Sequence, residues 1–188
     1  MARRSVEPPV DLDDQQADPE QVARTILLRR LEAAPRTRAQ LASTLQERGV
    51  PDDVAARVLD RFEDVGLIDD RTFARMWVQS RQVSRGLAPR ALRAELRRRG
   101  VSDELVDEAL SDVDLDAQLV AARAIAERKA RSLRGLPRQT QVRRLSGALA
   151  RKGYGPGLVS QVVREALDSL QGESDLDHEG GADWSWEA

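Results

Sequence analysis

The sequence predicts an all-α protein made of three tandem three-helix repeats of about 50 residues each. Three observations indicate this fold class: apolar residues recur at helical spacing, one short motif occurs three times, and aromatic residues make up only 3% of the 188 residues. A core with so few large rings has to be assembled from Leu, Val, Ile and Ala, which favours thin helical layers. The repeats are expected in an elongated arrangement, straight or curved, with disordered acidic tails at both ends.

The repeated motif is a Leu, a second Leu four residues later, a basic residue three further on and then a glycine. It occurs at Leu41–Gly49, Leu92–Gly100 and Leu145–Gly153. The glycines are 51 and 53 residues apart, and apolar residues follow each of them at five and ten positions. Self-similarity at such a period is typical of a repeat architecture. Because one unit of this size buries little surface alone, neighbouring repeats should lean on one another.

Repeat 1 is expected to cover residues 19–66. Its first helix follows a capping Asp, has Pro at its first position and stops before Pro35. The second helix begins at the Thr37–Gln40 capping box and ends at Gly49, and Gly66 ends the third. The expected core residues are Val22, Ile26, Leu27, Leu31, Leu41, Leu45, Val54, Val58, Leu59 and Phe62.

Repeat 2 is expected to cover residues 67–113. Asp69 or Asp70 can cap its opening helix by accepting free N–H groups. The second helix should occupy residues 89–99, and Ser102 should cap the third.

The opening helix of repeat 2 has two distinct faces at 100° per residue. Phe73 and Trp77 share one face, flanked by Met76 and Val83, and both rings are expected in the core. The opposite face carries Arg71, Arg75, Gln82 and Arg85.

Repeat 3 is expected to cover residues 114–170. Its opening helix should span about residues 116–133, its second helix should end near Lys152, and Pro156 should begin its last helix. Helical periodicity ends at Leu170.

The net charge of −2 hides a basic body between two acidic tails. Residues 1–20 carry −4 and residues 171–188 carry −6, whereas residues 21–170 carry +8. Residues 1–18 and 171–188 lack helical periodicity and are expected to be disordered.

The C-terminal tail contains Trp184 and Trp186, which are unusual in an acidic segment. Two interpretations stay open. The rings occur by chance in a disordered end, or the tail folds back on the basic body, in part through contact of the rings with Arg side chains.

Composition excludes several classes of function. The chain has no Cys and only His178, which removes disulfides and thiolate chemistry and nearly removes His-based metal or Ser–His sites. We therefore expect no cofactor, no metal and no enzymatic activity. No apolar run reaches the ~20 residues that cross a bilayer, and the N-terminus lacks the apolar middle of a secretory signal. A cytoplasmic protein is expected.

Two features that resemble catalytic or phosphate sites have structural explanations. Each motif glycine lies past a helix C-terminus, which is the wrong end for a phosphate. The Gly-rich run at Gly153–Gly157 has no preceding strand, and Asp69 and Asp70 are explained by capping.

The arginines are the candidate binding residues, because a guanidinium makes planar, bidentate contacts to carboxylate or phosphate. Arg90, Arg93 and Arg97 lie in one row on the second helix of repeat 2, so this repeat is expected to hold the densest positive patch. The candidate set for partner binding is Arg71, Arg75, Arg81, Arg85, Arg90, Arg93, Arg97, Arg143, Arg144 and Arg151.

The stretch GLIDDRTFAR beginning at Gly66, followed by Ser80-Arg81 and Gly86, resembles the RecX family, bacterial regulators of the RecA recombinase. The three-fold Leu–Leu–basic–Gly motif strengthens this resemblance, which covers about residues 20–170. It implies a non-enzymatic protein, expected to be a monomer, with a role in DNA repair, homologous recombination and the SOS response. It further implies docking into the groove of the RecA filament on single-stranded DNA, with inhibition of strand exchange and of ATP hydrolysis by RecA.

A second function class stays open, namely a direct DNA-binding protein that uses its helix pairs like helix–turn–helix readers. The basic stripe supports it. A charge of +8 over residues 21–170 is modest, however, and only Tyr154 looks available for stacking on single-stranded bases. Direct contact with nucleic acid is therefore expected to be weak.

Overall fold

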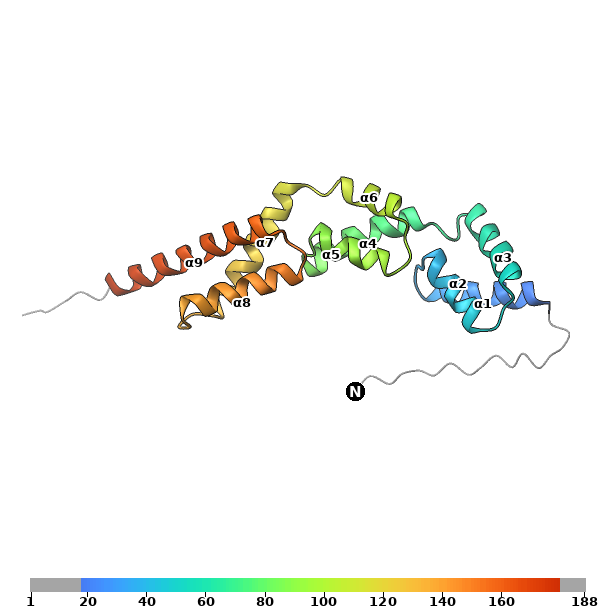
Figure 1. Cartoon of the computed structure of the whole chain (residues 1–188), viewed down its shortest axis with the longest axis horizontal. Coiled ribbons are helices and arrows are strands. Elements are labelled where there is room, and N and C mark those ends of the chain that lie inside the picture. Colours follow the sequence, from blue (N-terminus) through green and yellow to red (C-terminus); the bar gives the residue numbers. More distant parts are fainter. Residues whose placement is uncertain (1–17, 180–188) are drawn as a thin grey trace, which may run out of the picture. The chain divides into compact units, whose positions relative to one another are not determined.

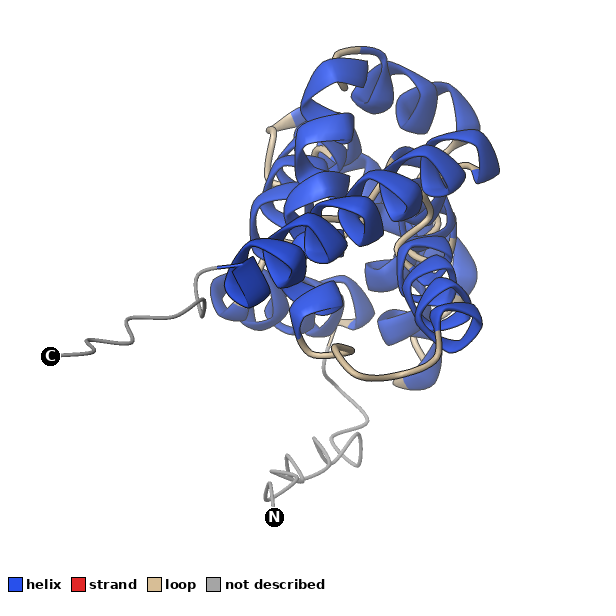
Figure 2. Cartoon of the chain, turned by 90° about the vertical axis from the view of Figure 1, so that its left-hand side faces the viewer, coloured by secondary structure: helices blue, strands red, loops and turns tan. Residues whose placement is uncertain are grey.

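The computed structural model describes the backbone of residues 18–179 and the side chains of residues 18–171. Over this range the chain forms nine α-helices and no strand (Figure 1, Figure 2), so the all-α prediction is confirmed. The helices are α1 (Pro19–Ala33), α2 (Arg38–Glu47), α3 (Asp52–Asp64), α4 (Asp70–Arg85), α5 (Pro89–Arg97), α6 (Asp103–Ser111), α7 (Leu115–Arg131), α8 (Arg138–Arg151) and α9 (Pro156–Glu179).

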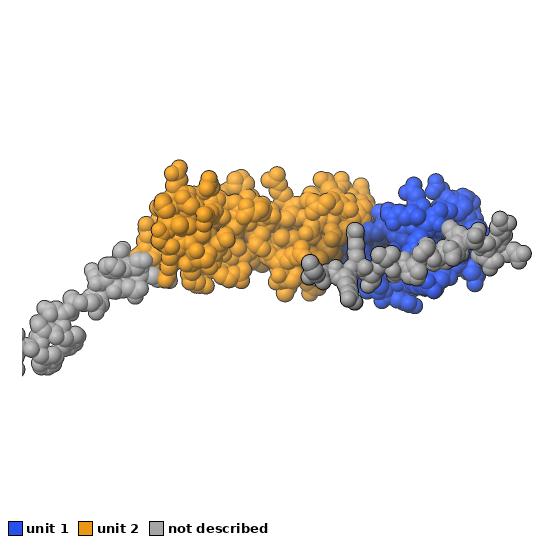
Figure 3. Space-filling model, turned by 90° about the horizontal axis from the view of Figure 1, so that it is seen from below, with its two compact units in different colours: residues 1–73 blue, residues 74–188 orange. Residues whose placement is uncertain are grey.

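The chain divides into two compact units, residues 1–73 and residues 74–188, which Figure 3 colours separately. The first unit contains α1 to α3 and the first turn of α4. The second contains the rest of α4 and α5 to α9. The elongated arrangement of the three repeats stays a prediction.

The repeated motif has the same structural role in all three repeats. Its glycines, Gly49, Gly100 and Gly153, have φ of 74°, 77° and 90°. This left-handed conformation is unfavourable for residues with a Cβ, and it ends α2, α5 and α8. The motif leucines are at most 1% exposed in each repeat: Leu41, Leu45, Leu92, Leu96, Leu145 and Leu149.

The first unit has the core and the caps that the sequence predicts. Eight of the ten predicted core residues are buried, and Val22 and Leu31 pack against them at the edge. The Thr37 hydroxyl accepts the Gln40 N–H at 3.2 Å, and the Gln40 side chain accepts the Thr37 N–H at 3.3 Å. The Asp18 carboxylate accepts the N–H of Glu20 at 3.1 Å.

Asp69 and Asp70, at the start of α4, cap different helices. The Asp69 carboxylate accepts the Thr72 N–H at 2.9 Å and the Thr72 hydroxyl at 2.6 Å, which caps α4 and lowers the pKa of Asp69. Asp70 instead accepts the Arg38 N–H at 2.9 Å, so it caps α2 from a distance of 32 residues in sequence. Burial raises the pKa of Asp70, and the bond from Arg38 offsets this only in part.

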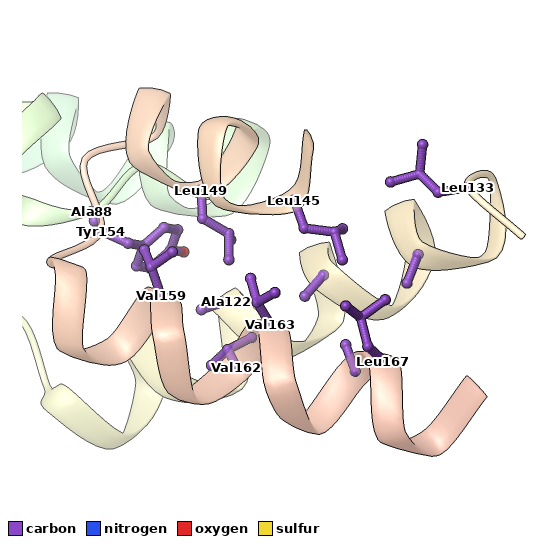
Figure 4. Packing of buried hydrophobic residues seen from close by; sticks show 13 residues of the cluster. Ala88, Ala122, Leu133, Leu145, Leu149, Tyr154, Val159, Val162, Val163 and Leu167 are labelled. Atoms are coloured by element: carbon purple, nitrogen blue, oxygen red, sulfur yellow. The ribbon is translucent and has the colours of Figure 1, made fainter. Parts of the chain in front are cut away.

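In the second unit, repeats 2 and 3 share a tightly packed joint. Figure 4 shows Ala88, from the loop between α4 and α5, beside Tyr154 in the hydrophobic cluster of repeat 3. The Ala88 N–H donates to the Lys152 carbonyl at 2.8 Å, and the Tyr154 hydroxyl donates to the Gly86 carbonyl at 3.1 Å. A Cβ added at Gly153 would lie 2.5 Å from the backbone nitrogen of Ala91.

The predicted inward face of α4 is confirmed at Phe73, which is buried, but its flanking residues are wrong. Met76 and Val83 are 55% and 85% exposed, whereas Ala74 and Val78 are buried with Phe73. The buried face of α4 thus includes the small side chains of Ala74 and Val78 and not Trp77, which has the largest ring. Trp77 is only half-buried and lies at the edge of the core, because its indole N–H needs a polar partner there.

The predicted end of regular structure at Leu170 is also wrong, because α9 continues to Glu179. Residues 171–179 contain no Pro, and Gly172 is their only Gly. Each further residue can therefore add a backbone hydrogen bond to an existing helix. The Gly180-Gly181 pair follows the helix end. The tail interpretations for Trp184 and Trp186, and residues 1–17, lie outside the described residues.

Replacing Gly153 with Ala should destabilise the second unit more than the matched change of Gly49 to Ala destabilises the first. Both changes place a Cβ at positive φ, at a cost of about 1–2 kcal/mol. Only Gly153 adds a clash with Ala91, for about 1–3 kcal/mol more, because nothing lies within 4 Å of a Cβ at Gly49. Urea unfolding of both variants measures the difference, and equal losses would show that the joint is not tightly packed.

Replacing Asp70 with Asn should preserve the bond from the Arg38 N–H without a half-buried charge, whereas replacement with Ala should cost about 1 kcal/mol. Since the folded pKa of Asp70 is raised, its stabilising contribution is complete below the unfolded pKa and is lost as the pH rises through the folded pKa. The free energy of unfolding of the Asn variant should therefore rise relative to that of the wild type between acidic and neutral pH. Urea unfolding at several pH values measures this difference. A constant difference would contradict this role of Asp70.

Candidate basic interaction surface

Most candidate arginines of repeat 2 are neutralised by carboxylates of the same repeat. Four of them form ion pairs, three with acids of α6 or its N-terminal end and one with Glu95 of α5. The pairs are Arg75–Glu108 at 2.6 Å, Arg81–Glu95 at 3.6 Å, Arg93–Asp107, and Arg97–Asp103 at 2.6 Å. These side chains would have to exchange partners before binding another anion.

A cluster around Trp77 holds one of these arginines in place. The guanidinium carbons of Arg81 and Arg99 lie 4.0 and 3.6 Å from the indole ring centroid, and the indole N–H donates to the Glu95 carboxylate at 2.9 Å. Arg99 also donates to the Glu95 carbonyl at 2.8 Å, and burial lowers its pKa. Arg81 is therefore a structural residue that joins α4 to α5.

The other candidates of repeat 2 differ in their availability. Arg85 and Arg90 are exposed, and no carboxylate within residues 18–171 pairs with either. Arg71, at the start of α4, is engaged in an interaction of its own. Two of the seven candidates in this repeat are thus open to a partner.

The excess positive charge lies in repeat 3, which corrects the prediction for repeat 2. Residues 67–113 carry nine basic and eight acidic side chains, for a net charge of +1, whereas residues 114–170 carry eleven and five, for +6. Between Glu127 and Glu165 there are ten basic side chains and no acidic one. The net charge of each repeat can be counted from the sequence, and this count identifies repeat 3 as the most basic. The row of arginines on α5 predicts a basic patch in repeat 2 only if nearby carboxylates are left out.

Six of these ten basic side chains line a groove between α7 and α8. It consists of two adjoining hollows of about 520 and 350 Å³, which share Lys129 and Arg151. The larger hollow has Ile125 and Ala148 among its apolar lining residues, and the smaller has Leu133. The cationic lining residues of the two hollows are Arg128, Lys129, Arg143, Arg144, Arg151 and Lys152, and no carboxylate lines either.

Helical spacing explains how the groove is assembled. Arg144, Ala148 and Arg151 lie at i, i+4 and i+7 on α8, so they share one face. On the inner side of α7, Ala122, Ala126 and Ala130 are fully buried at four-residue spacing, so α7 can approach its neighbours closely. The basic side chains of α7 are thereby brought to the same groove as those of α8.

The cations of the groove have few partners among residues 18–171. The Lys152 ammonium donates to the Arg85 carbonyl. For Arg128, Lys129, Arg143, Arg144 and Arg151, no carboxylate of residues 18–171 lies within 4.0 Å. Like charges gathered without counter-charges raise the local potential, which favours binding of an anion. Three predicted residues, Arg143, Arg144 and Arg151, are therefore brought together, and Arg128, Lys129 and Lys152 were missed.

Tyr154 does not have the role that the DNA-binding interpretation gave it. It is 5% exposed, its ring lies in the core of repeat 3, and burial raises the pKa of its hydroxyl. It is not available for stacking on a base.

Among the described residues, no group of three or more His, Cys, Asp or Glu side chains could hold a metal ion. None of the helices that the structure describes is long and apolar enough to span a membrane. The arrangement found in repeat 3 is suited to binding an extended anion.

Comparison with known proteins places this architecture in one family. Family models for the first, second and third three-helix domains of RecX match residues 23–62, 69–110 and 116–163. The chain belongs to the RecX family. This confirms both the resemblance and the three-repeat fold predicted from the sequence, and the basic groove lies within the third RecX domain.

Named relatives agree with this assignment. The chain is 50% identical over 163 residues to the regulatory protein RecX of Streptomyces coelicolor, covering 87% of this chain and 86% of the relative. It is 48% identical over 154 residues to that of Thermobifida fusca, covering 82% and 83%. RecX proteins are thus regulatory proteins by name, and this chain matches them over most of its length.

Solved RecX structures share the fold. The crystal structure of RecX from Lactobacillus salivarius superimposes with a TM-score of 0.72 at 19% identity, covering 79% of this chain and 97% of that one. A second crystal structure of a regulatory protein RecX gives 0.71 at 23% identity, covering 77% and 73%. At 19% and 23% sequence identity, this structural similarity supports a shared fold only.

Replacing Trp77 with Phe should lower the free energy of unfolding of the second unit by about 1 kcal/mol, because the bond to Glu95 and part of the cation–π contact are lost. The neighbouring change of Met76 to Ala is the control, since Met76 is 55% exposed and a surface change there should stay within about 0.5 kcal/mol. Urea unfolding compares the two. Equal effects would mean that the Trp77 cluster does not stabilise the fold.

Proposed function

We propose that this RecX family protein is a negative regulator of the RecA recombinase. It acts in the cytoplasm as a monomer, binds the groove of the RecA filament on single-stranded DNA, and inhibits strand exchange and ATP hydrolysis by RecA. It catalyses no reaction itself. The observation that carries this proposal is the match to all three RecX domains, together with an unneutralised basic groove in the third.

Binding alone accounts for the inhibition. A ligand that has different affinities for two states of an assembly shifts the balance between them by that difference in binding free energy. A protein that spans neighbouring RecA subunits needs no catalytic group for this effect.

The contact surface is proposed to centre on repeat 3. Arg143, Arg144 and Arg151 form no ion pair with any carboxylate of residues 18–171, so a new anionic partner would not have to displace one of these carboxylates. Arg85 and Arg90 extend the surface into repeat 2. The paired arginines Arg75, Arg81, Arg93 and Arg97, together with the engaged Arg71, make smaller contributions.

Replacing Arg143, Arg144 and Arg151 with Ala should weaken inhibition of RecA. The loss of three charge-assisted contacts, each worth about 1 kcal/mol or more, predicts that about a hundredfold or more protein is needed for half-inhibition. The measurement is the rate of ATP hydrolysis by RecA on single-stranded DNA as each protein is added. Wild-type protein that left this rate unchanged would refute the proposed function.

Two further triple variants locate the contact. Replacement of Arg75, Arg93 and Arg97 with Ala tests repeat 2 and should cost less, because each of these side chains is already ion-paired. Replacement of Arg29, Arg57 and Arg61 removes the same charge from repeat 1 and should leave inhibition intact. If the repeat 2 triple had the largest effect, the contact would centre there and not on the groove.

A further inference from the structure

We infer that the groove between α7 and α8 binds the phosphodiester backbone of DNA directly, so that repeat 3 contacts the nucleic acid of the filament as well as protein. The inference rests on the proposed function for its role in the filament. Binding itself does not depend on RecA, and it can be measured without it.

The first argument is the arrangement of the cationic side chains along the groove. Arg144 and Arg151 are seven residues apart on α8, which separates their Cα atoms by about 10 Å along the helix axis. Lys129 lines both hollows from the α7 side. A row of cations along two joined hollows suits an anion that repeats along a chain, whereas a single small anion needs a closed cage of donors.

The second argument is the chemistry of the donors. Four of the six cationic lining residues are arginines, which offer forked N–H pairs that match phosphate oxygens. Arg151 lines both hollows, so its guanidinium can contribute to contacts along the whole groove.

The third argument concerns what the groove lacks. Phosphate-only contact is independent of sequence, whereas single-strand binding through the bases needs exposed aromatic platforms. Tyr154 is buried, and none of the residues lining either hollow is aromatic. The Ser132 hydroxyl is already used on the Lys129 carbonyl at 2.7 Å. The groove should therefore bind DNA through its backbone, with strong salt dependence and little base preference.

The test uses the full chain and a fluorescent oligothymidine strand, without RecA, with anisotropy recorded at salt concentrations from about 50 to 200 mM. The groove variant replaces Lys129, Arg144 and Arg151 with Ala. Three lost phosphate contacts should weaken binding by about tenfold or more and reduce the slope of log affinity against log salt by about 2, at about 0.7 for each contact. Circular dichroism checks that the helices remain.

The matched control removes three positive charges from repeat 1, by replacing Arg29, Arg57 and Arg61 with Ala. It should bind within about twofold of the wild type, because none of these three side chains lines the groove. An oligoadenosine strand should bind as tightly as oligothymidine. Polyglutamate of equal charge should compete poorly.

Three results would overturn the inference. The groove variant could bind DNA as tightly as the wild type, or the control could lose as much as the groove variant, which would indicate bulk charge only. Polyglutamate could compete as well as DNA, which would identify the groove as a surface for acidic protein, including this chain's own acidic C-terminal segment.

The RecA ATPase assay with the same groove variant separates this inference from the proposed function. Normal DNA binding with lost inhibition would overturn the DNA contact and leave regulation of RecA intact. Lost DNA binding with normal inhibition would support the DNA site and place the contact with RecA on another surface.

Discussion

Each repeat depends on two fully buried leucines, one turn apart on its middle helix, and on a glycine that ends this helix with positive φ. Such a small core holds together only if the chain turns sharply enough to lay the third helix over the leucines. In repeat 3 the same glycine also touches the backbone of repeat 2 at Ala91, where any Cβ would clash. The positive φ of this glycine therefore ends the middle helix of repeat 3, and its missing Cβ allows close contact with repeat 2.

The distribution of charge follows from this packing. In repeat 2, α6 lies against α5, and its acids neutralise the arginines that would otherwise form a basic face. In repeat 3, α7 and α9 pack against each other, and Glu165 of α9 pairs with Arg123 of α7, which lines neither hollow of the groove. Arg123 lowers the pKa of Glu165. The groove itself keeps its positive charge.

The proposed regulatory role requires a binding surface, and repeat 3 offers one in its basic groove. The two hollows of repeat 3 are open and lined by basic side chains. Binding an extended polyanion requires only that cations be held in a row on a rigid element. Lys152 and Tyr154, which follow the end of α8, donate hydrogen bonds to the carbonyls of Arg85 and Gly86 and so connect this end of α8 to repeat 2.

The helices, their caps and the three-fold motif could be predicted from sequence, because capping residues, left-handed glycines and apolar spacing act over a few residues. The availability of each arginine could not. It depends on carboxylates brought near by packing, as when Asp107 neutralises Arg93, or on their absence, as around Arg151. Likewise, the sequence of α4 contains both Trp77 and Ala74, but only contact with other helices decided which of them is buried. Local rules specify elements, whereas the folded chain decides which charges remain available to a partner.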